Sequence, residues 1–428
     1  MTGLRGLVLT ALVVGLVGQI ACKDNTTATT NTKTVSPSPQ ASSGDSLRKS
    51  AEQGDAESQH LLGVCYEVGV NVERDPDQAV AWYRKSAEQG YAKGQYKLGY
   101  CYKTGTGVKP YRDAAVKWFR RAAEQGQADA QYELGVCYDN GEGVEKDPTQ
   151  AAHWYRKAAE QGIAGAQNTL GISYVNGEGV EKDPSHAVKW FRKAAEQGNA
   201  SAQKNLGVCY VHGMGVEKNP VEGVKWLRKA AEQGLENAQF MLGFCYMDGI
   251  GVEKDPAEAV RWYSMAEKQR NAEAQCALGS CYENGTGVEK DLSKAVFYYR
   301  LSAGQGNAEA QYNLGVWCYK GVEYKDYPGA VRWFRLAAEQ GFAKAQNNLG
   351  DCYENGIGVE KDAAQAVMWY RKAAEQGLAM AQFSLGSFYN GGVGVEKNPV
   401  EGVKWIRKAA EQGFEPAKEA LRKLGEKP

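Results

Sequence analysis

Residues 127–162 read QADAQYELGVCYDNGEGVEKDPTQAAHWYRKAAEQG, and the chain repeats this stretch between residues 55 and 413. A Leu-Gly pair stands at the position of Leu134-Gly135 in ten successive copies, in steps of 36 residues with a single step of 35. A fixed period of this size is typical of a stacked array of supersecondary units. We therefore predict ten tandem units, at 55–90, 91–126, 127–162, 163–198, 199–234, 235–270, 271–306, 307–341, 342–377 and 378–413.

The spacing of the apolar residues predicts two helices in each unit. At about 100° per residue, Leu134 and Tyr138 share one face of the first helix, and Trp154 and Ala158 share one face of the second. Gly135 in mid-helix costs about 1 kcal/mol against alanine, and its presence in all ten units predicts a close helix–helix approach. A two-helix unit cannot bury its apolar face alone, so the units must stack into an all-α solenoid.

Glycine and proline mark the helix ends. Gly141-x-Gly143 ends the first helix, because glycine adopts the left-handed conformation without steric penalty. Asp147-Pro148 begins the second helix as N-cap and first helical residue. Gln131 also recurs in all ten units. A catalytic residue is needed once, so we interpret this glutamine as structural, bonded to loop backbone.

The unit resembles a known repeat. The string A-x-A-Q-x-x-L-G-x-x-Y-x-x-G-x-G-V-x-K-D-x-x-x-A-x-x-W-Y-x-x-A-A-E-Q-G, nearly whole in residues 128–162, is similar to the Sel-one-like repeat, a branch of the tetratricopeptide-type helical repeats. The resemblance covers about 360 of the 428 residues. It implies a right-handed α-solenoid used for protein–protein contact. It implies no particular partner, because fold does not fix function.

The charge balance excludes one class of partner. The chain has 51 basic and 51 acidic residues and a formal net charge of zero. The chain therefore has no excess of positive charge that would attract nucleic acid or an acidic membrane surface.

Residues 1–22 are expected to be a signal peptide of the lipoprotein type. Arg5 supplies a positive start and residues 7–17 an apolar stretch too short to span a bilayer comfortably. Ile20-Ala21-Cys22 resembles the end of a bacterial lipobox, whose cysteine is lipidated, although Gln19 stands where leucine is usual. We expect export to the bacterial periplasm or outer membrane, with a lipid on Cys22 as the only link to the membrane. Ordinary secretion and an uncleaved anchor are the alternatives.

The remaining ends of the chain lack complete units. Residues 23–45 are rich in Thr, Ser, Asn and Pro and are expected to form a disordered tether. The solenoid is then predicted over 46–428, with residues 46–54 as a half-unit cap. Residues 416–424 predict a charged capping helix, which such an array requires.

Seven of the ten cysteines share one position of the unit. Equivalent positions in neighbouring units are separated by a helix pair, on the order of 15–20 Å, whereas a disulfide needs Cα atoms within about 7 Å. We therefore predict buried free thiols, with Cys276 and Cys318 outside the pattern. The seven are Cys65, Cys101, Cys137, Cys209, Cys245, Cys281 and Cys352.

The sequence gives little support for a metal, a cofactor or an enzyme. The four histidines fall in four different units, whereas a metal site needs a cluster of ligands. Ser46-x-x-Lys49 and Lys103-Thr104-Gly105 match two of three serine β-lactamase and penicillin-binding motifs. Ser-Asp-Asn, the third, is absent, and both strings occupy ordinary repeat positions. We predict no catalytic residue; a cell-wall enzyme of that type, as proposed for cysteine-rich relatives, is the alternative.

Three positions of the first helix vary freely among the units, those of Tyr132, Val136 and Asp139. They lie on the face turned away from Leu134. First helices line the concave groove of tetratricopeptide-like stacks, so by resemblance this stripe is the candidate partner-binding surface. Its candidate contact residues are Tyr96, Tyr100, Tyr132, Lys204, Phe240, Phe244, Met247, Tyr312 and Phe383.

Two aromatic clusters on this stripe carry the functional prediction, one around Tyr96 and Tyr100 and one of Phe240, Phe244 and Met247. Exposed apolar patches mark contact sites, and aromatic residues dominate contact energies. The alternative is that these side chains pack against the helix of the next unit. We predict a monomeric scaffold or adaptor that holds a protein or peptide in its groove. A structural spacer without a specific partner remains a further alternative.

Overall fold

The computed structural model describes residues 41–321 and 325–426, and these residues form 22 helices and no strand. The predicted signal peptide with Cys22, and the tether as far as residue 40, lie outside the described residues.

Each repeat contributes a first and a second helix, and within the two compact units described below helices that follow one another in the chain lie in contact. The first helices are α3 (Ala56–Val68), α5 (Ala92–Thr104), α7 (Ala128–Asn140), α9 (Ala164–Asn176), α11 (Ala200–His212), α13 (Glu236–Asp248), α15 (Ala272–Asn284), α17 (Ala308–Lys320), α19 (Ala343–Asn355) and α21 (Ala379–Gly391). The second helices are α4 (Pro76–Glu88), α6 (Arg112–Glu124), α8 (Pro148–Glu160), α10 (Pro184–Glu196), α12 (Pro220–Glu232), α14 (Pro256–Glu267), α16 (Leu292–Gly304), α18 (Tyr327–Glu339), α20 (Ala363–Glu375) and α22 (Pro399–Glu411). Terminal helices α2 (Ala41–Glu52) and α23 (Glu415–Lys423) complete the array.

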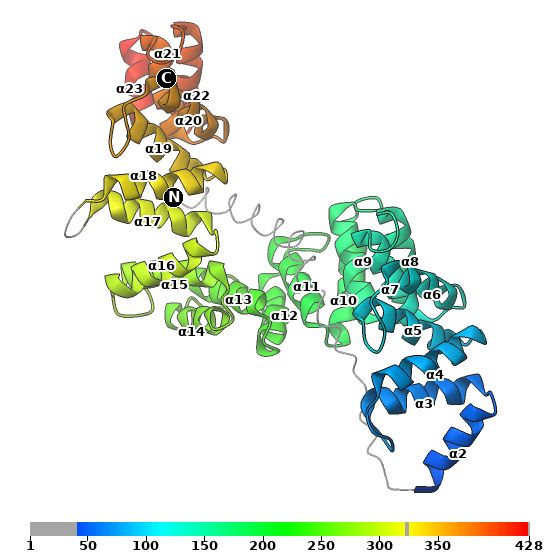
Figure 1. The fold of residues 1–428 in the computed structure, drawn as a ribbon. Coiled ribbons are helices and arrows are strands. Elements are labelled where there is room, and N and C mark those ends of the chain that lie inside the picture. Colours follow the sequence, from blue (N-terminus) through cyan, green and yellow to red (C-terminus); the bar gives the residue numbers. More distant parts are fainter. Residues whose placement is uncertain (1–40, 322–324, 427–428) are drawn as a thin grey trace. The chain divides into compact units, whose positions relative to one another are not determined.

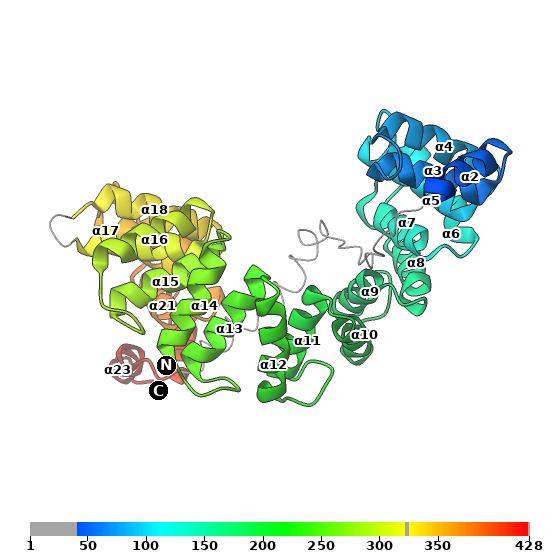
Figure 2. The same ribbon diagram turned by 90° about the horizontal axis from the view of Figure 1, so that it is seen from below.

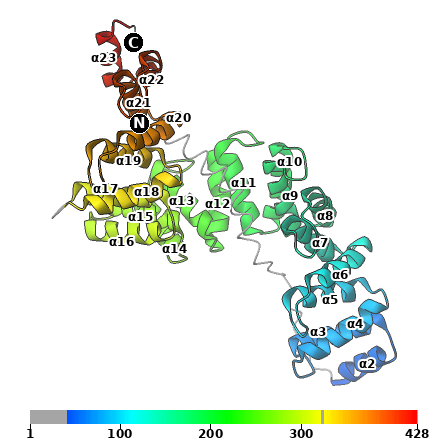
Figure 3. The same ribbon diagram turned by 45° about the horizontal axis from the view of Figure 1, so that its top comes forward.

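The helices divide into two compact units. The first holds α2 to α12, the second holds α14 to α23, and the boundary falls within α13. Within each unit the hairpins follow one another in chain order, each beside the next (Figure 1, Figure 2). Figure 3 shows this order clearly for α17 to α23.

The helix ends form as the sequence predicts. Gly141 has a φ of 73°, and its N–H donates to the Cys137 carbonyl. The Asp147 side chain accepts hydrogen bonds from the backbone N–H groups of Thr149 and Gln150, both at 3.0 Å. These bonds satisfy donors that an α-helix leaves unpaired at its start.

Two glycines of the unit permit close packing, one within a repeat and one between repeats. A Cβ added to Gly135 would lie 2.7 Å from the Tyr155 ring of the partner helix, which confirms the predicted close approach. A Cβ added to Gly143, whose φ is 68°, would lie 2.5 Å from the Arg112 carbonyl of the preceding repeat. The same contact occurs at the equivalent glycine of eight repeats, so in these the turn after the first helix rests on the start of the second helix before it.

The hydrophobic core of one repeat continues into the next, as the third repeat shows. Phe119 of α6, Leu134 of α7, Tyr155 of α8 and Leu170 of α9 belong to one cluster, and all four are fully buried. Burying a side chain of this size stabilises the fold by roughly 1.5–3 kcal/mol. Every repeat thus depends on its neighbours.

Polar side chains form hydrogen bonds both within a repeat and between neighbouring repeats at the edge of this core. The Gln131 Nε2 donates to the Ala123 carbonyl of the preceding second helix at 3.1 Å, and Gln161 Nε2 donates to Gln131 Oε1 at 2.7 Å. The equivalent Gln–Gln bond is present in all ten repeats, between 2.7 and 3.0 Å. The predicted structural role of Gln131 is confirmed. Arg156, although exposed, donates to the Tyr174 hydroxyl of the next repeat at 3.0 Å.

The two terminal helices cover the ends of the core. Helix α2 begins at Ala41, so residues 41–45 belong to the cap and not, as we predicted, to the tether. At the other end, Ala417 and Leu421 of α23 are buried against Ile406 of α22. The opposite side of α23 carries charged residues, among them the Lys418–Glu415 ion pair.

Candidate partner-binding surface

The nine candidate contact residues lie on first helices, but most are only partly accessible. Tyr100 alone among the nine is exposed, with 38% of its surface accessible. Lys204 is 5% accessible and buried, so it does not present the contact surface that we predicted for it. The other seven are half-buried: Tyr96, Tyr132, Phe240, Phe244, Met247, Tyr312 and Phe383.

The half-buried rings have partners on neighbouring helices. Tyr312 lies 6.0 Å from Phe334 of its own repeat and 5.2 Å from Phe342 of the next, measured between ring centroids. Phe383 likewise lies 5.7 Å from Phe414. Packing between repeats, the alternative to an exposed groove, therefore holds at these positions.

The apolar cluster at Phe240 is packed in the same way. Its ring lies 5.8 Å from the ring of Tyr263 in α14. Phe240 and Met247 both contact the core formed by α14 and α15. These side chains already contribute to the stability of the second unit, which sequence periodicity alone did not reveal.

The surface around Tyr100 has a different construction. On α5, Tyr100 lies three residues after Lys97 and three before Lys103. Lys97 pairs with Glu67 of α3 at 2.8 Å, and Lys103 pairs with Glu133 of α7 at 2.6 Å. The exposed ring therefore has an ion pair to a neighbouring first helix on either side.

Half-buried rings support this exposed one. The Tyr96 ring lies 6.2 Å from that of Tyr100 and 6.1 Å from that of Phe119. On α7, Tyr132 packs 5.8 Å from Tyr155. Tyr96 and Tyr132 are therefore fixed by the core, whereas Tyr100 offers an aromatic surface to a partner.

The third position of the variable stripe serves the fold in several repeats. The Tyr155 hydroxyl donates to Asp139 at 3.2 Å, and Tyr299 donates to Glu283 at 2.7 Å. Tyr83 with Glu67 and Tyr370 with Glu354 form the same bond. Where the second helix has Phe, Leu or Ile in place of this tyrosine, the stripe holds no acid: the pairs are Phe119 with Lys103, Phe191 with Val175, Leu227 with Val211, Phe334 with Tyr319, and Ile406 with Asn390.

These tyrosine–acid pairs were missed by sequence reasoning, although comparing the ten copies position by position could have found them. Tyr263 with Met247 is the one tyrosine without an acid. Burial raises the pKa of Asp139 even though Tyr155 donates to it. At Glu67, burial pushes the pKa upward, but bonds from Lys97 and Tyr83 outweigh it and leave the pKa below its usual value.

The cysteines agree with the predicted free thiols. All nine cysteines of the described residues are free. Six of the seven at the shared position are buried as predicted, whereas Cys65 is only half-buried; Cys276, outside the pattern, is buried too. Burial raises the pKa of Cys137, Cys209, Cys245 and Cys352 to about 12. The thiolate is the reactive form, so these side chains are unreactive at neutral pH.

The residues of the two alternative enzyme motifs are either exposed on a helix or bonded within the fold. Ser46 and Lys49 are exposed on α2. Lys103 is paired with Glu133, and the Thr104 hydroxyl donates to the Tyr100 carbonyl at 3.0 Å. Within the described ranges, no cluster of His, Cys, Asp and Glu could hold a metal ion. No helix in these ranges is long and apolar enough to cross a membrane.

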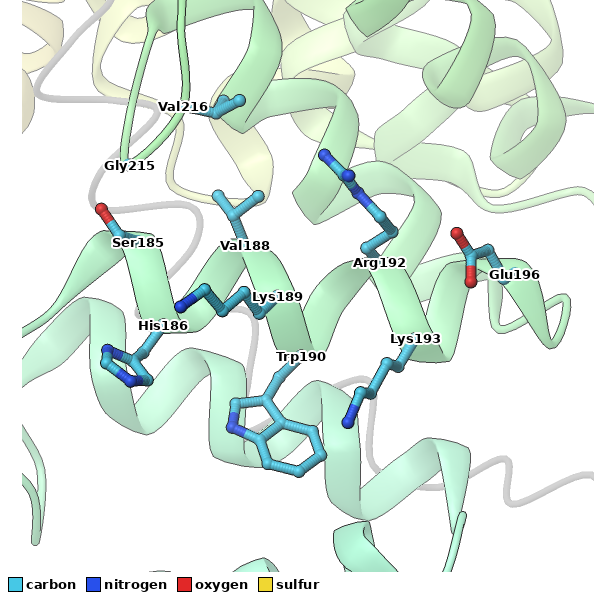
Figure 4. A pocket seen from close by; sticks show the side chains of 10 residues that line it. All are labelled: Ser185, His186, Val188, Lys189, Trp190, Arg192, Lys193, Glu196, Gly215 and Val216. Carbon is cyan, nitrogen blue, oxygen red and sulfur yellow. The ribbon is translucent and has the colours of Figure 1, made fainter.

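A shallow hollow of about 570 Å³ lies on the other side of the array, over the second helix α10. Figure 4 shows its lining, with Trp190 and Lys193 pointing to the same side of the helix. The Lys193 Nζ lies 4.4 Å from the Trp190 ring centroid. His186 bonds to Asp183 through Nδ1 at 2.5 Å, and this aspartate caps the helix. The hollow contains none of the nine candidate residues.

Comparison with known proteins agrees with this architecture. A sequence model of the Sel1 repeat matches residues 56–91, 92–127, 128–163, 164–199, 200–235, 237–271, 272–307, 308–342, 343–378 and 379–414. A search of curated proteins found no match.

Two solved structures are similar over most of their length. The first is a protective antigen of uropathogenic Escherichia coli with an SLR fold, 37% identical, with a TM-score of 0.59 and 89% of each chain covered. The second is a Sel1 repeat protein from Oxalobacter formigenes, 35% identical, with a TM-score of 0.56, covering 72% of this chain and 89% of its own.

Proposed function

Because the chain belongs to the Sel1 repeat family, whose members generally mediate protein–protein interaction, we propose that it is a non-catalytic scaffold or adaptor that binds a protein or peptide on its first-helix face. The groove of the first unit, around Tyr100, is the proposed contact site.

The exposure of Tyr100 is the observation that supports this site. Most rings of the stripe are held in packing between helices, and Tyr100 remains accessible beside them. A partner side chain that covers this ring removes apolar surface from water at little ordering cost, because Tyr96 already supports it. The ion pairs at Lys97 and Lys103 supply polar surroundings without net charge. This arrangement suits a protein or peptide surface of mixed polarity.

The cellular place of the protein is part of the same proposal. We propose that it is exported and held at the bacterial envelope by a lipid on Cys22. The charged start, the apolar stretch and the Ile20-Ala21-Cys22 sequence support this. One similar protein is a protective antigen of a pathogenic bacterium, which agrees with an envelope location.

A photo-crosslinking amino acid placed at Tyr100 tests the proposed site in intact cells. We expect it to capture one defined partner, identified by mass spectrometry, from the native envelope. The matched control carries the same amino acid at Glu160, which is exposed on the second-helix side, and should capture nothing specific. The Tyr100→Ser variant should retain its melting temperature and lose the partner.

Two other outcomes would contradict the proposal. Absence of any product from position 100, with normal expression, would favour the structural spacer. Hydrolysis of nitrocefin or covalent labelling by a fluorescent penicillin would favour the cell-wall enzyme.

A further inference from the structure

The second-helix side of the array differs in three consecutive repeats. In the other seven, a lysine or arginine three residues after the tryptophan lies over its ring, at 3.9 to 4.7 Å from the centroid. Figure 4 shows this arrangement for Trp190 and Lys193. The sixth, seventh and eighth repeats have Met265, Leu301 and Leu336 at this position.

These apolar side chains are exposed. The accessible fractions are 41% for Met265, 37% for Leu301 and 39% for Leu336. Phe297, one turn before Leu301, is 55% accessible where most repeats have a basic residue. We call Met265, Phe297, Leu301 and Leu336 the apolar face.

The apolar face lies on successive second helices of the second unit. Its residues belong to α14, α16 and α18. Tyr298 of α16 packs on the core of the sixth repeat, and Trp333 of α18 packs on that of the seventh. Each of these helices therefore follows the one before it in the stack, with Met265, Leu301 and Leu336 at the same position of the repeat. Exposed apolar side chains gathered on one side of a protein mark an interaction site.

The charges beside the apolar face indicate the chemistry of its partner. Eight repeats have a glutamate six residues after the tryptophan, as Glu196 is after Trp190 in Figure 4, and the eighth repeat is among them with Glu339. The sixth and seventh repeats have Lys268 and Gly304 there instead. Helix α16 carries no acidic residue at all. Among the described residues, no acid lies within ion-pair distance of Arg300, Arg332 or Lys268.

We propose that the apolar face binds an amphipathic helix whose apolar stripe is flanked by acidic residues. A helix rises about 1.5 Å per residue, so residues seven apart are about 10 Å apart on one face. Such a helix, laid across α14, α16 and α18, places one apolar residue on each of Met265, Leu301 and Leu336. Its acidic residues then face Lys268, Arg300 and Arg332. This site is separate from the groove at Tyr100 and does not depend on it.

Fluorescence anisotropy with a synthetic probe tests the proposal on the purified chain. The probe is a labelled helical peptide of about 20 residues, with leucine at every seventh position and glutamate beside the leucines. A second peptide with lysine in place of glutamate is the charge control. We expect the acidic peptide to bind at least about tenfold more tightly than the basic one.

The chain itself provides the matched variants. Met265→Gln, Leu301→Gln and Leu336→Gln together should weaken acidic-peptide binding at least about tenfold. The equivalent set in the first unit is Lys157→Gln, Lys193→Gln and Lys229→Gln. These lysines lie outside the apolar face, so their replacement should leave the affinity for the acidic peptide within about twofold. Circular dichroism checks that both sets keep their helical content. If the triple variant unfolds, the single variant Phe297→Gln replaces it in the binding measurement. Phe297 is the most exposed residue of the apolar face, so its replacement should disturb the fold least.

Several results would overturn the proposal. Equal binding of both peptides, or undiminished binding by the apolar-face variants, would exclude this partner chemistry. A wild-type dimer in sedimentation that the apolar-face variants dissociate would assign the face to a second copy of the chain. Flotation with phosphatidylglycerol vesicles that the same variants abolish would assign it to a membrane surface.

Discussion

Gly207, in the middle of α11, leaves no room for a side chain of its own. A Cβ added there would lie 2.8 Å from both the Gly223 carbonyl and the Leu227 Cγ. We expect Gly207→Leu to lower the free energy of unfolding by at least about 3 kcal/mol, because overpacking alone costs about 1–3 kcal/mol and the nearest atom is backbone. Glu160→Ala on the exposed face should cost under about 0.5 kcal/mol. Equal shifts in melting temperature for the two variants would contradict the assignment of faces.

The buried thiols make stability depend on pH. Burial raises the pKa of Cys209 and Cys245 from 9.0 to about 12, and that of Cys101 to about 11. Below pH 9 the thiols are protonated in both folded and unfolded chains, so stability is unaffected. Above pH 9 the unfolded chain releases protons that the folded chain keeps, and stability falls until the folded pKa is reached.

We therefore expect the urea midpoint to be steady from about pH 7 to 8.5 and to fall between about pH 9 and 10. Over that interval the free energy of unfolding should decrease by up to about 1.4 kcal/mol per pH unit for each buried thiol. Buried tyrosines add to this only above their ordinary pKa near 10. Cys209→Ala with Cys245→Ala should reduce the slope. Ellman's reagent should react slowly with native protein and fully in guanidinium; a low count after denaturation would reveal disulfides.

At the scale of one hairpin, the hydroxyl of the buried tyrosine and the acid of the first helix form a unit. Tyr155→Phe removes the donor from Asp139, and Asp139→Val leaves the buried Tyr155 hydroxyl without its acceptor. We expect each single change to cost about 1–3 kcal/mol. The double change recreates the Phe191 and Val175 pair of the fourth repeat, so it should cost less than the sum.

Urea unfolding of the four proteins measures this coupling. We expect an interaction energy of about 0.5–3 kcal/mol, the range for residues in contact. Strict additivity would show that the covariation between repeats has another origin. The same cycle on Tyr263 and Met247, which have no hydroxyl–acid bond, provides the comparison.

The sequence predicted the positions of the helices more reliably than the solvent exposure of individual side chains. Ten copies of one pattern repeat the positions of Gly141, Asp147 and Gln131, so each signal is confirmed many times within one chain. The solvent accessibility of Lys204 or Phe240 depends on how closely a neighbouring helix packs against the first-helix face. The periodicity of the sequence does not reveal that packing distance. The apolar face at Leu301 was readable as a departure from the lysine of other repeats, but only the structure shows that it is exposed.

At the scale of the whole molecule, the proposed attachment to the envelope rests on one residue. Cys22→Ser should abolish labelling by radioactive palmitate and release the protein from the membrane fraction, because no acyl chain remains to hold it. Globomycin treatment of the wild type should accumulate the precursor. Unchanged fractionation of the Cys22→Ser protein would instead indicate an uncleaved apolar anchor.

The array also depends on its last helix. Ala417 and Leu421 of α23 cover Ile406, Ala409 and Ala410, which would otherwise lie in water at the end of the second unit. A repeat array needs such a polar-faced cap for solubility. Ending the chain at Gly413 should therefore lower the melting temperature and promote aggregation. Leu421→Gln, which keeps α23 but places an amide without hydrogen-bond partners in its buried face, should lower stability by about 1–3 kcal/mol. Lys423→Gln on the exposed side is the matched control and should be neutral. A truncated chain that stays soluble with an unchanged melting temperature would show that the tenth repeat closes the array by itself.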